Sequence, residues 1–559
     1  MKASKRVGGR LMLGMVITAM LASACVGPPE DESQGSADDT GTEATGSETA
    51  ANGDGEGDSD GEEIIRLSMD SEPDILEPHF FRTDAAYTLT ANFYEPLIRQ
   101  TYAEDGAVLN GTDDYEGALA EEWEISEDGL EATFRLREDA QFANGDPITA
   151  EDVKYVFQRS IEGPGYITAL LPFIGIESAD QIEVVDEHTL VIRPSFESPL
   201  FERFMTFQVF GAMNKQVAEE NATEEDPWAT DWFTGNVTAS GPYDLASWDQ
   251  GREAVLEPNP NYWGADQVEN DGVIMRTIPN AEERALLLRS GELDVADGLP
   301  PRMVKDLEES GELAVHRIPS SRITYLGMNN DIAPFDDPAV RQAISYALPY
   351  EAIRDQVLEG YASIAKSPVP PAMESYAGEE FWDYDTDVDQ AKQLLDDAGV
   401  EPFSTELGVR QSVPEDVEAA VFIQDALRQL DIDVEIVQLP DAEFNERLNE
   451  RSLPMFFHDW YSWGEDPFFQ LTFLLQSESF TNYASYANDE VDRLIEEGSF
   501  ELDPERRAEL SRQAQELIIE DAPWGFLYSA DYLVVAQPEV TGITRPYDQH
   551  LRFQYLSKD

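Results

Sequence analysis

Residues 118–159 read ALAEEWEISEDGLEATFRLREDAQFANGDPITAEDVKYVFQR, and this stretch combines the local patterns of strand and helix. Asp128 and Gly129 form a turn between two segments in which apolar and polar residues alternate, which predicts a β-hairpin. Thr149 then precedes a segment whose apolar residues recur every three or four positions, which predicts a helix. Asp152, three positions later, supplies a weaker form of the capping box. Strands followed at once by a helix predict a mixed α/β chain.

Two Asp-Pro pairs mark further helix starts in the second half of the chain. Asp337 and Asp503 can each cap a helix, and the proline that follows each of them suits the first helical position. The apolar residues beyond each pair again recur at helical spacing. These pairs predict helices that begin at residues 338 and 504.

The region between these pairs adds a helix end and a helix-to-strand unit. Gly399 can close a helix over residues 391–398 as a left-handed cap. A helix around residues 421–430 then leads into a strand at 434–437, an arrangement typical of α/β lobes. Because 559 residues exceed what one ordinary core accommodates, we predict an α/β protein of two or three lobes.

The first 62 residues differ from the rest in composition. Basic residues precede an apolar run from Leu11 to Leu21, which predicts a signal peptide over residues 1–24. The only cysteine, Cys25, ends the stretch LASAC, which resembles a bacterial lipobox and implies lipidation of Cys25, although Ala22 stands where leucine is usual. A plain secretory signal and an uncleaved anchor are the alternatives. Residues 25–62 are small, polar and acidic and predict a disordered tether.

The net charge restricts the class of partner. The chain carries 113 Asp and Glu residues against 37 Lys and Arg residues, a formal net charge of -76. Nucleic acid is excluded as an expected partner, because a phosphate backbone attracts basic surfaces. A solvated acidic surface suited to high salt, where self-repulsion is screened, explains the excess best.

The sequence contains no motif that specifies catalysis or a metal site. No pair of histidines has the i, i+4 spacing of a helical metal site; the five are His79, His188, His316, His458 and His550. Neither a glycine-rich phosphate loop nor a G-x-S-x-G nucleophile elbow occurs. We therefore predict a protein that is not an enzyme and has no cofactor, with a secreted hydrolase as a less favoured alternative.

Several blocks in one order carry a resemblance to a known family. They are SEPDILEPHF, the stretch at 118–159, SGPYDLASWDQGREAVLEPNPNYWG, RSGELDVADGLP, YLGMNNDIAPFDDPAVRQAISYAL, ASYANDEVDRLIEE and ELSRQAQELIIEDAPW. From about Ile64 to its end, the chain resembles the oligopeptide- and dipeptide-binding family of substrate-binding lipoproteins that serve ABC importers, solute-binding protein family 5.

The resemblance implies a two-lobed clamshell fold like that of periplasmic binding proteins, with an extra N-terminal domain. By analogy, lobe I is discontinuous and comprises residues 63–107, 236–328 and 531–559. The additional domain would span 108–235, and lobe II would span 329–530.

The resemblance also implies a ligand site within FFHDWYSWGEDPFFQ, residues 456–470. Many family members bind the ligand ammonium through the aspartate of a W-x-x-D pattern, and Trp463-Gly464-Glu465-Asp466 fits it. Asp466 is therefore expected to pair with the ammonium and Trp463 to pack over the ligand. Glu465 is the nearest competitor, unless its side chain points outward. In so acidic a chain the alternative for Asp466 is solvated surface, and aromatic clusters more often form core than site.

Other expected ligand contacts rest on position in the family pattern. Because side chains alternate along a strand, only one of the neighbouring residues Trp460 and Tyr461 would face the cleft. Gly241 would allow close backbone approach, although a simple turn explains it as well. The candidates are Trp460, Tyr461, Tyr325, Asn329, Phe93, Tyr94 and Gly241.

The function implied is binding without chemistry. The chain would capture di- or oligopeptides by closure of its lobes and deliver them, as a monomer, to a membrane permease. The same fold with another solute, such as a nickel chelate or an oligosaccharide, is the alternative. A lipoprotein that senses or adheres without transport is another.

Overall fold

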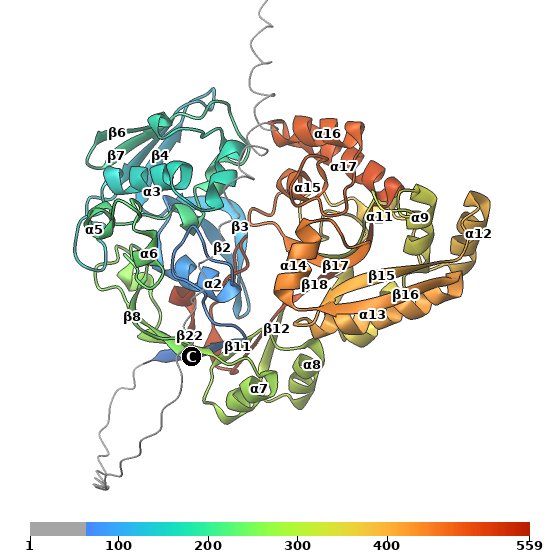
Figure 1. The fold of residues 1–559 in the computed structure, drawn as a ribbon. Helices are drawn as coiled ribbons and strands as arrows, with labels where there is room; N and C mark the ends of the chain where they lie inside the picture. Colours follow the sequence, from blue (N-terminus) through green and yellow to red (C-terminus); the bar gives the residue numbers. More distant parts are fainter. Residues whose placement is uncertain (1–62, 559) are drawn as a thin grey trace, which may run out of the picture. The chain divides into compact units, whose positions relative to one another are not determined.

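The structure is a computed structural model, and it describes residues 63–558. Five β-sheets and the helices between them make up this region, which confirms the predicted α/β class (Figure 1). The predicted signal peptide, Cys25 and the tether lie outside the described residues. Within residues 63–558, every helix falls short of the length and apolar character that crossing a membrane requires.

The largest sheet takes seven strands from three distant parts of the chain. Across the sheet they are β12 (Ala314–Ile318), β19 (Tyr532–Ala536), β11 (Val295–Asp297), β1 (Ile64–Met69), β10 (Gly272–Thr277), β9 (Glu253–Pro258) and β8 (Tyr243–Asp249). β1 lies inside the sheet and pairs in parallel with both β10 and β11. Each of the three segments predicted for lobe I supplies at least one of these strands.

A second sheet of six strands lies in the later half of the chain. Its order is β14 (Ala362–Ile364), β18 (Trp524–Ala530), β13 (Arg322–Met328), β17 (Met455–Tyr461), β15 (Phe403–Arg410) and β16 (Ile432–Leu439). Helix α13 (Pro414–Leu427) packs against β15 and β16, as expected for the predicted helix-to-strand unit. The helix begins earlier than the sequence prediction, because Pro414 provides its first turn.

Strand β13 belongs to the six-stranded sheet, so this sheet begins earlier in the chain than the predicted boundary of lobe I. The boundary at residue 328 assigned this strand to lobe I, yet β13 pairs with β17 and β18 of the six-stranded sheet. Six of its seven residues are buried: Ile323, Thr324, Tyr325, Leu326, Gly327 and Met328. The six-stranded sheet thus begins at Arg322. The division into lobes is otherwise still a prediction.

A four-stranded sheet lies within the segment predicted as the additional domain. Its order is β4 (Ala120–Ile125), β5 (Ala132–Leu136), β7 (Thr189–Ile192) and β6 (Ile182–Asp186). The hairpin of β4 and β5 is confirmed, and Gly129 in its turn has a φ of 64°. Helix α3 (Ala150–Glu162) packs on β6 and β7, and its start carries the capping box of Thr149 and Asp152.

Of two smaller sheets, one connects the C-terminal segment to an earlier part of the chain and the other lies within that segment. β2 (Ile98–Asp105) pairs with β3 (Val108–Gly117), and β3 pairs in parallel with β21 (Ile543–Arg545). β20 (Val540–Thr541) pairs with β22 (Ser557–Lys558). The remaining α-helices are α2 (Asp84–Phe93), α4 (Phe201–Phe204), α5 (Lys215–Asn221), α6 (Thr230–Phe233), α7 (Ala281–Ser290), α8 (Pro301–Ser310), α9 (Pro338–Ala347), α10 (Tyr350–Ala352), α11 (Gly378–Phe381), α12 (Val388–Ala398), α14 (Asp441–Asn449), α15 (Pro467–Leu475), α16 (Asp489–Ser499) and α17 (Pro504–Asp521).

The helix ends predicted from local sequence are confirmed. Asp337 accepts a hydrogen bond from the Ala339 amide at the start of α9, and Asp503 caps α17 in the same way. Gly399 closes α12 with a φ of 68°, in the left-handed region that glycine adopts without strain.

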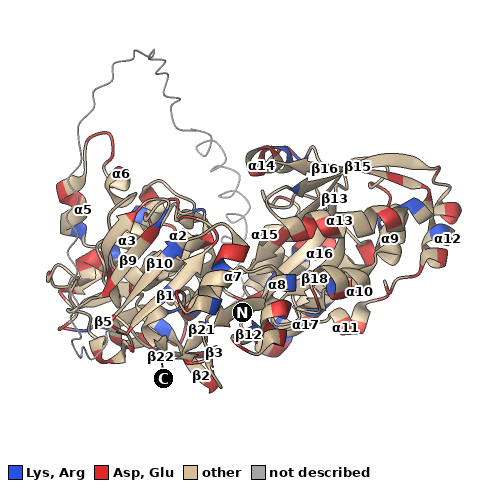
Figure 2. Cartoon of the chain, turned by 90° about the horizontal axis from the view of Figure 1, so that it is seen from below, with Lys and Arg blue, Asp and Glu red and all other residues tan. Residues whose placement is uncertain are grey.

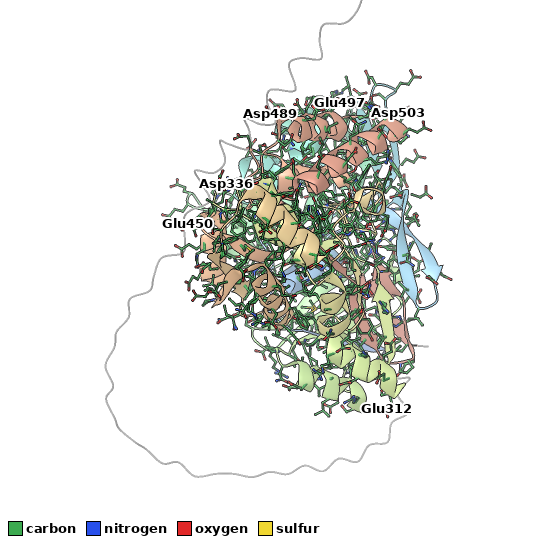
Figure 3. The ribbon with its side chains drawn as sticks, turned by 90° about the vertical axis from the view of Figure 1, so that its right-hand side faces the viewer. Glu312, Asp336, Glu450, Asp489, Glu497 and Asp503 are labelled. Carbon is green, nitrogen blue, oxygen red and sulfur yellow. The ribbon has the colours of Figure 1, made fainter. Side chains whose placement is uncertain are left out.

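Acidic side chains lie over most of the surface, as the composition requires. Figure 2 shows Asp and Glu on nearly every helix in view, with Lys and Arg in fewer places. Of the acids labelled at the rim in Figure 3, five belong to exposed residues: Glu312, Asp336, Glu450, Asp489 and Asp503. Exposed carboxylates of this kind are solvated surface, and their mutual repulsion weakens as salt rises.

Candidate functional site

Asp466 caps helix α15 rather than standing free at its start. Its Oδ1 accepts hydrogen bonds from the amides of Phe468 and Phe469, at 3.0 and 2.9 Å. The guanidinium of Arg507 lies 2.7 Å from Oδ2 and donates to Oδ1 at 2.9 Å. Asp466 is 1 % exposed. Burial alone would raise the pKa of this carboxyl group, but Arg507 and the helix amides hold the pKa below its usual range. Its predicted pairing with a ligand ammonium stays a prediction.

Glu465 faces a different partner from Asp466. Its backbone has a φ of 47°, which turns the chain between the two acids. Its side chain is buried and pairs with Arg545, the last residue of β21, at 2.6 Å. Arg203 donates to the carbonyl oxygens of Gly464 and Glu465, at 2.7 and 3.3 Å. The outward orientation considered for Glu465 is therefore wrong, because an ion pair holds the side chain inside the protein.

Trp463 lies in an aromatic cluster formed by distant parts of the chain. Its ring centroid is 5.5 Å from that of Tyr87 and 6.2 Å from those of Phe81 and Tyr166. Tyr87 belongs to α2, whereas Phe81 and Tyr166 lie in loops. The loop after β17 therefore inserts its tryptophan among aromatic residues of the first half of the chain.

Trp460 and Tyr461 contact different neighbours, as alternation along β17 requires. Trp460 stacks on Phe473 of α15, with ring centroids 5.8 Å apart. Tyr461 lies beneath the guanidinium of Arg322 at 4.9 Å, and its Oη is 3.5 Å from Nε2 of His550. Of the two, Tyr461 is the residue that contacts Arg322 and His550.

Tyr325 and Asn329 are core residues in this structure. The ring of Tyr325 stacks on Trp524 at 3.8 Å, and its Oη lies 3.3 Å from Nδ1 of His458. Asn329 donates from its amide to the carbonyl of Arg451 at 2.7 Å. Because both residues are about 1 % exposed, any ligand contact would need the chain to open around them.

Phe93, Gly241 and Tyr94 meet where α2 ends. The amide of Gly241 donates to the carbonyl of Phe93 at 2.8 Å, and a Cβ on Gly241 would lie 3.0 Å from the Phe93 backbone. The close backbone approach at Gly241 is therefore made to Phe93. Phe93 itself is fully buried in the core beneath the seven-stranded sheet.

Tyr94 and Trp463 line one cavity, and they are the predicted residues that the fold brings together there. The cavity has a volume of about 60 Å³, measured as the space that the centres of water molecules can occupy. Its other walls come from residues 91–102, 206–208 and 546–555. The loop that carries Trp463 covers one side of it. A pocket with polar walls and a movable aromatic cover suits a small ligand group.

Sequence reasoning missed a cluster of charges at the end of β17. Arg322 donates to one oxygen of Asp459 at 2.5 Å, and Arg410 donates to the other at 3.2 Å. Burial would raise the pKa of Asp459, but the two guanidinium groups lower it to about 2. Asp84 lies 3.8 Å from Arg322 and is largely exposed. Two arginines that share one half-buried carboxylate can bind a further anion.

The cluster depends on strand register. Arg322 stands opposite Tyr461 in the β13–β17 ladder, two residues along the strand from the Thr324–Asp459 pair, while β15 brings Arg410 from the other side. No local motif connects residues 322, 410 and 459. Within the described residues, no group of three His, Cys, Asp or Glu side chains is placed to hold a metal ion.

Comparison with known proteins gives one consistent result. Residues 114–482 match the family described as bacterial extracellular solute-binding proteins, family 5 Middle. The chain is 29 % identical over 486 residues to the probable D,D-dipeptide-binding periplasmic protein DdpA of Escherichia coli strain K12, covering 86 % of this chain and 91 % of that protein. It is 25 % identical over 526 residues to the oligopeptide-binding protein OppA of Bacillus subtilis, covering 89 % and 93 %.

A solved structure agrees with these sequence relatives. The ABC transporter-associated periplasmic binding protein DppA from Helicobacter pylori, in complex with the peptide STSA, superimposes with a TM-score of 0.74 at 25 % identity. The match covers 89 % of this chain and 98 % of that one. The periplasmic-binding-protein-like fold expected from the sequence is thereby confirmed. The chain belongs to the bacterial extracellular solute-binding proteins of family 5.

Proposed function

We propose that this protein is the extracytoplasmic substrate-binding component of an ABC importer, and that its cargo is a peptide. The observation that carries this proposal is the match to peptide-binding relatives along nearly the whole mature chain. Such a protein binds and releases its ligand without changing it. Closure needs contacts to both halves, so the ligand would favour the closed form only by touching each of them.

The ligand would lie along the end of β17, where several predicted residues gather. Trp463 and Tyr461 would pack against its backbone and side chains, and Tyr94 would border the cavity below Trp463. Arg322 would pair with the C-terminal carboxylate of the peptide. Its second partner, Asp84, is 3.8 Å away and largely exposed, so a ligand anion can replace Asp84 at small cost.

The protein would work as a monomer held near the membrane. A lipid on Cys25 would anchor it, residues 25–62 would act as tether, and the permease of the importer would recognise the closed form. The Cys25→Ser variant should appear in the culture medium instead of the membrane fraction. A variant that stays in the membrane fraction would contradict anchoring through Cys25.

Titration calorimetry with tripeptides tests the proposed function. Wild type should bind a tripeptide with a free C-terminal carboxylate more than tenfold more tightly than the same peptide amidated, because the amide cannot pair with Arg322. The Arg322→Gln variant should lose this preference. Arg428→Gln is the matched control, because Arg428 lies on the surface with its side chain 74 % exposed.

Native mass spectrometry of the purified protein provides an independent test. Co-purified molecules with the masses of short peptides would support the peptide cargo. A nickel chelate, an oligosaccharide or another solute as the main bound species would overturn it, as would hydrolysis of added peptides.

A further inference from the structure

The cavity beneath Trp463 contains polar groups that the protein itself does not satisfy. Both amide atoms of Gln208, which is 2 % exposed, lack a hydrogen-bond partner of good geometry within residues 63–558. The same holds for Nη1 of Arg99. Both residues line the cavity. An unsatisfied buried polar group costs about 1–3 kcal/mol, so such a cluster implies that another molecule supplies the partners.

Each charged residue of the cavity wall has a partner within the protein. Asp548 accepts a hydrogen bond from Arg552 at 2.5 Å. Arg99 donates to Glu116 at 2.7 Å. Glu95 accepts a hydrogen bond from the hydroxyl of Tyr262 at 3.2 Å, and burial raises its pKa to about 6. With these charged groups partnered, the open hydrogen-bonding capacity belongs mainly to the amide of Gln208.

The size and cover of the cavity suit part of a ligand. Its volume of about 60 Å³ for water centres corresponds to about four to six water molecules. Trp463 is the only wall residue that comes from the loop after β17, and Arg203 fixes that loop through the Gly464 carbonyl. Movement of this loop with the six-stranded sheet would uncover the cavity from that side.

We propose that this cavity is a subsite for an uncharged hydrogen-bonding side chain of the ligand, a carboxamide or a hydroxyl. The inference rests on the proposed function, because it assigns one side chain of the peptide. A carboxamide both donates and accepts, so it can pair with both atoms of the Gln208 amide. A leucine side chain has nearly the shape of asparagine but would leave these groups unsatisfied. Such a pocket would discriminate between asparagine and leucine more strongly than a purely apolar pocket could.

Calorimetry with matched peptides tests the subsite. The probes are Asn-Ala-Ala against Leu-Ala-Ala, and Ala-Asn-Ala against Ala-Leu-Ala. Wild type should bind the asparagine peptide at least about tenfold more tightly in one of the two pairs. Gln208→Met, which keeps the length of the side chain, should remove the preference. Gln216→Met on α5, away from the cavity, is the control.

Equal affinities within both pairs in wild type would overturn the inference while leaving peptide binding intact. A preference that survives in Gln208→Met would also overturn it. If no peptide binds, the proposed function fails, and crystals soaked in acetamide then test the cavity alone. An acetamide molecule hydrogen-bonded to Gln208 would support the subsite. Water as the only occupant would overturn it.

Discussion

The Asp466→Asn variant separates a structural role of this carboxylate from a role in ligand binding. Asparagine caps a helix about as well as aspartate, so the two amides of α15 keep an acceptor. The negative charge opposite Arg507 is lost, however, and the side chain of Arg507 is only 10 % exposed. Removing one partner of a buried ion pair costs about 3–5 kcal/mol, because the other charge stays buried.

The expected loss lies near the lower end of that range. Arg507 also donates to the carbonyl of Gly498 at 3.2 Å, and Glu374 lies 3.7 Å from it. We therefore expect Asp466→Asn to lower the free energy of unfolding by about 3 kcal/mol. Asp466→Ala should lose about 1 kcal/mol more, since it also removes the cap.

Equilibrium unfolding in urea measures these differences. The double variant Asp466→Asn with Arg507→Met should be clearly more stable than the sum of the two single variants, because no charge is left unpaired. The pKa of Asp466 is lowered in the folded protein, so the difference between wild type and Asp466→Asn should be fully present above about pH 4 and shrink as the pH falls below it. An Asp466→Asn variant that unfolds like wild type but no longer binds peptide would refute this reasoning.

Three further variants test other features. Burial raises the pKa of Asp416 to about 7. Asp416→Asn should therefore gain stability relative to wild type as the pH rises from about 4 to about 7, and the difference in stability should stay constant above about pH 7. Thermal unfolding at several pH values measures this difference. Gly542 and Gly399 have φ of 76° and 68°, but a Cβ on Gly542 would collide with a backbone carbonyl whereas one on Gly399 would meet nothing. Alanine at 542 should therefore lower the melting temperature more than alanine at 399. Glu465→Gln should lower the free energy of unfolding in urea by about 3 kcal/mol, since it removes the carboxylate that pairs with the largely buried Arg545. A loss under about 1 kcal/mol, typical of exposed pairs, would contradict this.

Local chemistry made part of this fold predictable. A capping aspartate before a proline or a glycine after an apolar run acts over a few residues, so α9, α12 and α17 could be placed from the sequence. The strand β13 could not be assigned to its sheet in this way, because its partners lie more than a hundred residues away. The cluster of Arg322, Arg410 and Asp459 was hidden for the same reason: it exists only once the strand register is known.

Asp466 satisfies a family motif and a local folding rule at once. It precedes Pro467 and an apolar run, as Asp337 and Asp503 precede their own prolines, and all three cap a helix. Its carboxylate already holds Arg507, so a ligand ammonium would gain this partner only by displacing a buried guanidinium. The displacement would cost about what the new pair returns. We therefore expect N-acetylation of a peptide to weaken binding less than C-terminal amidation does. If calorimetry shows a larger loss of affinity on N-acetylation than on C-terminal amidation, the ligand ammonium pairs with Asp466.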